Sequence, residues 1–336
     1  MRLETLQDLL MESYGIDIDE IENKKNIYLI KSGDKEYSLK TIKYDYPHFY
    51  FILSAILHLK NRGFENIPDI IETRKGKKYI AFDNKFCYLS PWITSRESNY
   101  DNVIELMEVT KKLAELHLSS QGFSLNRKMR PRIFWFRWID NFQTRESEIL
   151  DFKKRINQKM YKSEFDKLYL SVMEDELKQI EETITDLKKY NYFDRMNKEV
   201  FKRGFCHHDY AHHNVLVTGN REMYVIDFDY CILDSSLHDL SSLIIRSMKN
   251  GKWDNKKAIE ILENYNSVNR LFKDDNKIIG TFIKFPQQFW QLGIQYYWEQ
   301  QPWGEEFFVD KLKKYIEDRE EKQEFIKEFT NSRIRL

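Results

Sequence analysis

The sequence predicts an α+β protein of two lobes, a smaller N-terminal lobe built on a mixed β-sheet and a larger, mainly helical C-terminal lobe. Paired strand-like runs dominate residues 1–92, whereas beyond residue 93 apolar residues mostly recur at the spacing of a helix. The chain has 336 residues, of which 41% are hydrophobic, so it is long enough to bury a core in each lobe. We therefore expect lobes at residues 1–92 and 93–336.

The N-terminal lobe is expected to contain two hairpins with a helix between them. Residues 5–14 have helical spacing and end at Gly15, which suits a helix C-cap. Residues 49–61 are apolar around most of a helix and end at Gly63, which indicates a buried helix. The expected strands are residues 26–30, 36–42, 78–82 and 86–89. Pro91 and Trp92 then mark an extended crossing to the second lobe.

The C-terminal lobe is expected to be a set of amphipathic helices. A helical insertion at about residues 125–200 separates the first of them from the later motifs. Pro286 predicts a kink in one of the last helices. The expected helices are residues 102–118, 134–156, 165–190, 238–248, 255–264, 277–298 and 305–329.

Composition and charge exclude several classes of protein. Lys plus Arg and Asp plus Glu both total 54, so no net field favours nucleic acid or an anionic membrane surface. No apolar run approaches the ~20 residues of a membrane-spanning helix, and the acidic, amphipathic N-terminus predicts no signal peptide. The three cysteines Cys87, Cys206 and Cys231 are widely spaced, which predicts reduced thiols in a cytosolic compartment.

The segment CHHDYAHHN, residues 206–214, carries the strongest functional signal. Asp209 and Asn214 are five positions apart, the separation at which a kinase-type loop places its catalytic Asp and a metal-binding Asn. A strand, turn and strand follow over residues 215–226 and lead to Asp227 in VIDFD. That order supplies a second carboxylate for Mg²⁺ and predicts phosphoryl transfer.

Lys40 in YSLKTIK is the candidate for binding the nucleotide phosphates. It lies on a predicted strand that follows a tight turn, the position from which a kinase-type Lys reaches the α- and β-phosphates. A strand lysine is by itself usually a solvated side chain. The Asp, Asn and Asp that follow downstream in the right order favour the functional interpretation.

Five segments together resemble the aminoglycoside and choline phosphotransferase type of the protein-kinase-like fold: YSLKTIK, YLSPWI, KKLAELH, HHDYAHHN and VIDFD. Two others, HLKNRGFENIPDI and FPQQFWQLGIQYYWEQ, are similar to the CotS family of bacterial spore coat proteins. The resemblance covers about residues 5–330. It implies a protein made in the cytoplasm of the mother cell, deposited on the spore coat and able to contact other coat proteins.

The resemblance also implies roles for individual residues toward ATP, or another nucleoside triphosphate, and Mg²⁺. Asp209 would be the catalytic base and His207 would brace the loop in the His-x-Asp signature. The implied magnesium ligands are Asn214, Asp227 and, as an auxiliary, Asp229. Lys40 would hold the phosphates. The backbone that would meet the adenine belongs to Leu89, Ser90, Pro91 and Trp92.

Two departures from the kinase pattern bear on turnover. The helix at residues 49–61 contains no Glu to pair with Lys40, so Lys40 must be held another way. The segment at residues 22–29 contains no glycine, where protein kinases have a Gly-rich loop. The expected function is phosphoryl transfer to a hydroxyl-bearing acceptor. The alternative is a weakly active or inactive scaffolding protein of the spore coat.

Three further patterns have competing explanations. His207, His208, His212 and His213 could bind zinc, although the stretch is predicted as a loop and VIDFD would then be unexplained. Cys206 could act as a nucleophile, but its setting in FKRGFCH predicts burial. Basic residues lie close to aromatic residues over residues 127–138, which suits either a solvated helix entry or a site for an anionic acceptor or coat partner. The basic residues are Arg127, Lys128, Arg130, Arg132 and Arg137.

Overall fold

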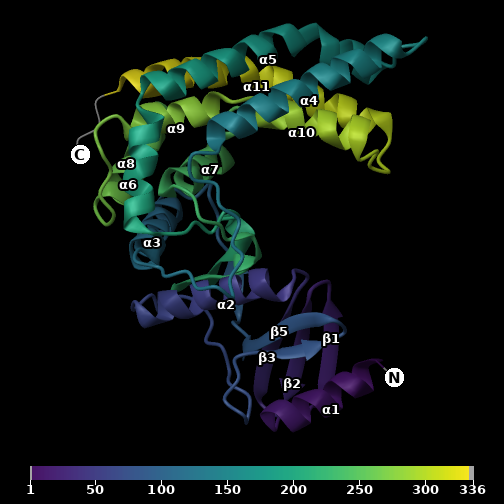
Figure 1. Ribbon diagram of the computed structural model, residues 1–336, viewed down its shortest axis with the longest axis vertical. Helices are drawn as coiled ribbons and strands as arrows, with labels where there is room; N and C mark the ends of the chain where they lie inside the picture. The colour runs from purple at the N-terminus through teal and green to yellow at the C-terminus, as the bar shows by residue number, and fades with distance from the viewer. Residues whose placement is uncertain (1, 333–336) are drawn as a thin grey trace. The chain divides into compact units, whose positions relative to one another are not determined.

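The computed structural model describes residues 2–332, which form two compact units (Figure 1). Unit 1 combines the chain up to residue 99 with residues 119–132 and 207–232. Unit 2 combines residues 100–118 and 133–206 with the chain from residue 233 onward. The lobes at residues 1–92 and 93–336 stay a prediction. All of the predicted site residues fall within unit 1.

Unit 1 contains a five-stranded sheet in the order β1-β2-β3-β5-β4. The strands are β1 (Glu20–Lys24), β2 (Ile27–Ser32), β3 (Lys35–Ile42), β4 (Ile80–Phe82) and β5 (Lys85–Pro91). Both predicted hairpins are confirmed. The α+β class is also confirmed, but the expectation of a mixed sheet is wrong, because all four described strand pairings are antiparallel. Each neighbouring pair except β3 and β5 is joined by a short hairpin, which imposes that direction.

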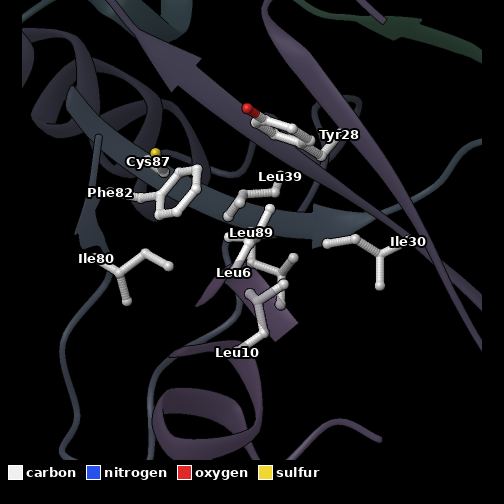
Figure 2. Packing of buried hydrophobic residues seen from close by; sticks show 9 residues of the cluster. All are labelled: Leu6, Leu10, Tyr28, Ile30, Leu39, Ile80, Phe82, Cys87 and Leu89. Carbon is white, nitrogen blue, oxygen red and sulfur yellow. The ribbon is translucent and has the colours of Figure 1, made fainter. Parts of the chain in front are cut away.

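Helix α1 (Arg2–Tyr14) covers one face of this sheet (Figure 1). Leu6 and Leu10, which are fully buried, point from the helix at the strands above them (Figure 2). The sheet side chains that receive them are Tyr28, Ile30, Leu39, Ile80, Phe82, Cys87 and Leu89. Because strand residues alternate between faces, Lys40 and Tyr88 lie on the face opposite α1. The packing of α1 thus leaves the second face for the candidate site.

Helix α2 (Tyr46–Asn61) connects the two hairpins and is longer than its predicted residues 49–61. Asp45 caps its N-terminus by accepting a hydrogen bond from the backbone nitrogen of His48, and Pro47 lies in the first turn, where its missing N–H costs nothing. Eight of its side chains are buried, which explains the apolar circumference seen in the sequence. None of them is a glutamate.

A second, three-stranded sheet in unit 1 carries the catalytic-loop motif. Its order is β6-β7-β8, formed by Ser95–Glu97, Val215–Thr218 and Met223–Val225. The predicted strand, turn and strand at residues 215–226 are therefore confirmed. The short β6 was not predicted, because all three of its side chains are exposed and polar and it has no apolar alternation.

Unit 2 is helical, and α4, α5, α10 and α11 lie side by side in it (Figure 1). The helices of the C-terminal half are α3 (Val103–Ser120), α4 (Trp138–Gln158), α5 (Glu164–Lys189), α6 (Tyr192–Lys202), α7 (Ser236–Met248), α8 (Asn255–Asn266), α9 (Asp275–Lys284), α10 (Gln287–Gly293) and α11 (Glu305–Asn331). Among the described residues, no helix combines the length and the apolar content that crossing a membrane requires.

Two predicted helices differ from the structure. The helix expected at residues 277–298 is divided at Phe285 and Pro286 into α9 and α10, and a π-helical turn, Ile294–Trp298, continues α10. Proline therefore breaks the helix rather than kinking it. The helix expected from residue 134 begins only at Trp138, because Phe136 has a positive φ of 65° and Phe134 bonds to the backbone of Leu233.

A buried ion network joins three helices of unit 2. The guanidinium of Arg195 on α6 donates to Asp275 at 2.6 and 3.2 Å and also to Glu199. The other carboxylate oxygen of Glu199 accepts from the backbone nitrogen of Ser236, at 2.9 Å, at the start of α7. Burial opposes ionisation of Glu199, but Arg195 and the other donors lower its pKa to about 2. Glu199 is therefore ionised in the folded protein.

The network predicts acid sensitivity. A carboxyl group whose pKa is lower in the folded state stabilises the protein above its unfolded pKa of 4.5, and that contribution is lost as pH falls toward 2. For Glu199 it amounts to roughly 3 kcal/mol. We expect the free energy of unfolding to fall less steeply over this pH range in Glu199→Gln than in the wild type, as measured by urea denaturation. If the free energy of unfolding fell equally steeply with pH in the two proteins, the low pKa assigned to Glu199 would be contradicted.

Candidate functional site

The catalytic-loop segment is held by His207, which is fully buried in unit 1. Its Nε2 lies 2.8 Å from the carbonyl oxygen of Ile226, and because a carbonyl only accepts, Nε2 carries the proton. Its Nδ1 accepts from the backbone nitrogen of Asp209 at 3.3 Å. The imidazole thus ties the loop to the residue that precedes Asp227. This contact agrees with the predicted bracing role.

Asp209 and Asn214 are adjacent in the structure as well as correctly spaced in sequence. Nδ2 of Asn214 donates to the backbone oxygen of Asp209 at 2.8 Å and to its carboxylate Oδ2 at 3.2 Å. The 3-10 turn His212–Asn214 closes the loop, and Asn214 is buried. Because its amide nitrogen is used as a donor, Asn214 presents Oδ1 as the atom that could bind a cation.

Ile226 sets the position of Asp227. Its nitrogen donates to the backbone oxygen of Asn214 at 3.0 Å, and its oxygen accepts from His207. Asp227 itself has φ 65° and ψ 63°, the left-handed conformation. His208 next to Asp209 is also left-handed, with φ 69°. Such non-glycine residues cost about 1 kcal/mol each and concentrate at functional sites.

Lys40 projects from β3 between two carboxylates. Its Nζ lies 2.9 Å from Oδ1 of Asp227 and 3.2 Å from Oδ2 of Asp229, and the lysine side chain is only 5% exposed. The sequence predicted that Lys40 must be held without a glutamate from α2, and these two carboxylates hold it. The structure therefore brings together three predicted residues from distant parts of the chain, Lys40, Asp227 and Asp229. Asn214 is tied to the residue before Asp227, because its backbone oxygen accepts from the nitrogen of Ile226.

The two carboxylates differ in their protonation. Burial opposes ionisation of Asp227, but the charge and hydrogen bond of Lys40 hold its pKa below the ordinary value. Burial raises the pKa of Asp229 to about 7, against the opposing charge of Lys40 and with the help of the Asp227 carboxylate. One buried ammonium is therefore too little positive charge to keep both carboxylates fully ionised at neutral pH.

The oxygens of this set suit a hard divalent cation. Asn214, Asp227 and Asp229 offer an amide oxygen and carboxylates, the ligands that Mg²⁺ prefers. Oδ1 of Asp229 is buried and has no hydrogen-bond partner in the part of the chain that the structure describes. A buried acceptor of this kind, beside two carboxylates that share a single ammonium, fits a bound cation. These three residues could therefore hold a magnesium ion.

The region expected to cover the phosphates is a tight turn. Lys25 and Asn26 join β1 to β2, and Lys25 has a positive φ of 59°. The carbonyl oxygen of Asn26 accepts from the backbone nitrogen and from Oγ1 of Thr41, both at 2.8 Å. The structure thus has a short turn fastened to β3 where protein kinases have a flexible Gly-rich loop. Strand β1 was not predicted, because its sequence is mostly charged and polar.

The four residues expected at the adenine lie at the end of β5 and just beyond it. The carbonyl oxygen of Leu89 accepts from Ile71 at 2.8 Å, and the nitrogen of Trp92 donates to Glu36 at 2.9 Å. Ser90 is buried, while Trp92 is 36% exposed and lies 6.0 Å from Nζ of Lys24. Two of the backbone groups that could bind a base are thus already engaged. Their assignment to adenine stays a prediction.

One residue of this site was missed by sequence analysis. Tyr88 is paired with Lys40 across β3 and β5 and is buried. Burial, with Asp229 and Asp227 nearby, raises the pKa of its phenol well above the usual value. A neutral phenol therefore lines the site beside the carboxylates. Its position one residue before the predicted adenine segment was the available signal.

The structure does not support the competing metal and nucleophile hypotheses. Among the described residues, the three potential ligand atoms that lie within 4.8 Å of one another belong to His117, Cys206 and Asp239, and this group includes none of the four loop histidines. Both ring nitrogens of His117 are hydrogen-bonded, to Tyr265 at 2.8 Å and Asp239 at 3.1 Å. Cys206 is buried as predicted, and burial raises its thiol pKa well above the usual value. A thiol in this state is a poor nucleophile.

The basic and aromatic segment is divided at residue 132 between the two units. In unit 2, Trp138 is buried and its indole nitrogen donates to both oxygens of Asp234, at 3.2 and 3.1 Å. Arg137 pairs with Asp140 on the same helix at 3.3 Å. In unit 1, Arg132 packs between two tyrosine rings. The segment is therefore not one continuous stripe of solvated arginines.

Comparison with known proteins shows the family and the fold of this chain. A family model described as "Spore coat putative kinase YutH" matches residues 7–329. An aminoglycoside phosphotransferase from Alicyclobacillus acidocaldarius superposes with a TM-score of 0.82 at 19% identity, over 95% of this chain and 93% of that one. Spectinomycin phosphotransferase with ADP and spectinomycin gives 0.66 at 20% identity, over 96% and 97%. Amicoumacin kinase, in complex with AMP-PNP, Ca²⁺ and Ami, gives 0.62 at 12% identity, over 97% and 93%.

These likenesses confirm the expected kinase-like fold of the aminoglycoside phosphotransferase type. They also confirm the expected resemblance to spore coat proteins. Identities of 12–20% carry the fold and not the substrate.

Proposed function

This chain belongs to the YutH family of kinase-like spore coat proteins, and we propose that it is an ATP- and Mg²⁺-dependent phosphotransferase that acts on a hydroxyl-bearing acceptor. The acceptor would be a small molecule or a component of the coat. The observation that carries the proposal is the contact of Lys40 with Asp227 and Asp229, 2.9 and 3.2 Å away, beside the paired Asp209 and Asn214. Two of the structural neighbours were crystallised with ADP or AMP-PNP, which supports a nucleotide ligand.

Each residue of the set then has a task in the transfer. Asp209 accepts the proton of the acceptor hydroxyl, and His207 keeps the loop in place through Ile226. Asn214, Asp227 and Asp229 would hold the cation, which when bound neutralises charge on the phosphates. Lys40, which contacts the two carboxylates, would bind the phosphates of the nucleotide. These ion pairs fix the position of the lysine amine.

The proposal is tested by following ADP formation from ATP and Mg²⁺ by the full chain with a panel of hydroxyl-bearing acceptors. The panel includes amino alcohols, sugars and serine-containing peptides. We expect at least one acceptor to accelerate ADP formation, and EDTA to stop it, because the carboxylates cannot orient the phosphates without a cation. A protein that binds ATP but forms no ADP with any acceptor would contradict the enzymatic proposal.

A scaffolding role in the coat is the second candidate. It is favoured by the turn at Lys25 and Asn26, which is fastened to Thr41 and leaves little backbone to wrap the phosphates. A kinase fold that binds partners without turnover would retain nucleotide or coat-protein binding in the absence of acceptor-dependent ADP formation. On either function we propose synthesis in the mother-cell cytoplasm followed by incorporation into the coat.

A further inference from the structure

Arg132 lies in an arrangement that the proposed function does not use. Its Cζ lies 5.9 Å from the ring centroid of Tyr44 and 5.9 Å from that of Tyr230. Its Nη2 donates to the backbone oxygen of Tyr230 at 2.9 Å. Two aromatic faces and one hydrogen bond thus fix the plane of the guanidinium.

The remaining donors of Arg132 have no anionic partner in the part of the chain that the structure describes. Nε is buried and has no hydrogen-bond partner among the described residues, and none of their carboxylates pairs with this guanidinium. Arg130, only two residues earlier, does have one, because its Nη1 lies 3.8 Å from Asp45. A buried guanidinium donor without an acceptor costs about 1–3 kcal/mol or more, so such groups usually have a partner, which can be protein, ordered water or a ligand.

A second buried polar atom without a hydrogen-bond partner among the described residues belongs to His48, which also contacts Tyr44. The ring of Tyr44 contacts that of His48, with centroids 4.5 Å apart. His48 is 6% exposed, and its Nδ1 lies 3.0 Å from the backbone oxygen of Arg130. The carbonyl only accepts, so Nδ1 is the donor and Nε2 is an acceptor in the neutral ring. Nε2 is buried and has no partner among the described residues.

The two tyrosines whose rings Arg132 contacts lie close in the chain to the proposed metal and nucleotide residues. Tyr230 directly follows Asp229 in the 3-10 turn Phe228–Tyr230, and Tyr44 lies four residues after Lys40. All of these residues belong to unit 1. A planar cation and a neutral acceptor that both contact the ring of Tyr44 suit a ligand that carries an oxyanion and an O–H group, such as a monohydrogen phosphate or a hydroxy acid.

We propose that Arg132, held between Tyr44 and Tyr230, is an anion-binding residue of the acceptor site, and that the acceptor carries a phosphate or carboxylate group besides its reacting hydroxyl. This inference rests on the proposed phosphotransferase function. Arg132 binds the anionic group through its free guanidinium edge, and Nε2 of His48 accepts from a hydroxyl of the same ligand. An uncharged sugar or a simple amino alcohol would leave both atoms unpaired.

Titration calorimetry with inorganic phosphate tests the assignment, in one arm on the full chain alone and in the other with saturating AMP-PNP and Mg²⁺. We expect phosphate to bind in both arms and to bind at least about tenfold more weakly to Arg132→Gln, because a charge-assisted hydrogen-bonding group is lost. Arg132→Lys keeps the charge, and its affinity for phosphate is expected to lie between those of the wild type and Arg132→Gln. Arg130→Gln, the matched control, should bind phosphate as the wild type does.

Several results would overturn the inference. Absence of phosphate binding to the wild type in both arms, or equal affinity of the wild type and Arg132→Gln, removes the anion site. Binding abolished by AMP-PNP assigns the site to the nucleotide and removes the acceptor assignment. If AMP-PNP itself does not bind, the proposed function fails, while the arm without nucleotide still decides the anion site. Thermal unfolding of each variant separates loss of binding from loss of fold.

Discussion

Replacing Asp209 by Asn is expected to slow phosphoryl transfer by about 10²–10⁴-fold, the usual contribution of a positioned general base. The amide cannot accept the hydroxyl proton, yet it has nearly the same shape as the carboxylate. The backbone nitrogen of Asp209 would keep its contact with His207, and the backbone oxygen would keep its contact with Asn214. The loss should therefore appear in kcat, with the affinity for nucleotide little changed.

The measurement is acceptor-dependent ADP formation, with nucleotide affinity determined on the same preparations. Asp34→Asn, at the tip of the hairpin between β2 and β3, is the control and should behave as the wild type. An Asp209→Asn variant that retains wild-type kcat would exclude this residue as the base. A variant with unchanged kcat but weaker nucleotide binding would instead place Asp209 among the groups that hold the cation.

Replacing Arg195 by Ala is expected to destabilise the protein by about 3–5 kcal/mol, because it leaves buried carboxylates without their cation. Glu199 and Asp275 are 5% and 2% exposed, and both pair with this guanidinium. Lys202, 3.2 Å from Glu199, would remain as its one cationic neighbour among the described residues. The network joins α6, α7 and α9, so its loss should destabilise the packing of these three helices in unit 2.

Urea denaturation measures this effect, and the same helix offers the control. Lys198 pairs with Asp194 at 2.9 Å, but both side chains are largely exposed, so Lys198→Ala should change the free energy of unfolding by less than about 1 kcal/mol. Equal effects of the two substitutions would show that the buried network contributes no more than a surface ion pair.

Short-range sequence signals predicted much of this fold. The hairpins at residues 26–42 and 78–89 follow from strand-like runs separated by tight turns, and the long helices follow from apolar periodicity. Strands β1 and β6 were not predicted, because edge strands are stabilised by backbone pairing and tolerate exposed, charged side chains. The division of α9 from α10 depends on how firmly Pro286 breaks the backbone, which a helical pattern does not encode.

The candidate site shows the same contrast. The spacing of Asp209, Asn214 and Asp227 lies within one short segment, so it can be recognised in the sequence. The absence of a glutamate from residues 49–61 also indicated that Lys40 is held by another group. That this partner is the pair Asp227 and Asp229 requires contacts across 187 and 189 positions of the chain. The position of Arg132 between Tyr44 and Tyr230 arises in the same way, from three segments that only folding brings together.

The central claim is that Asn214, Asp227, Asp229 and Lys40 form a magnesium-dependent nucleotide site. Calorimetric titration of the full chain with ATP, with and without Mg²⁺, tests it most directly. The wild type should bind ATP much more tightly with Mg²⁺ than without it, and Asp227→Ala should lose that dependence on the metal. ATP affinity that is absent in the wild type, or that is equally strong in Asp227→Ala, would contradict the claim.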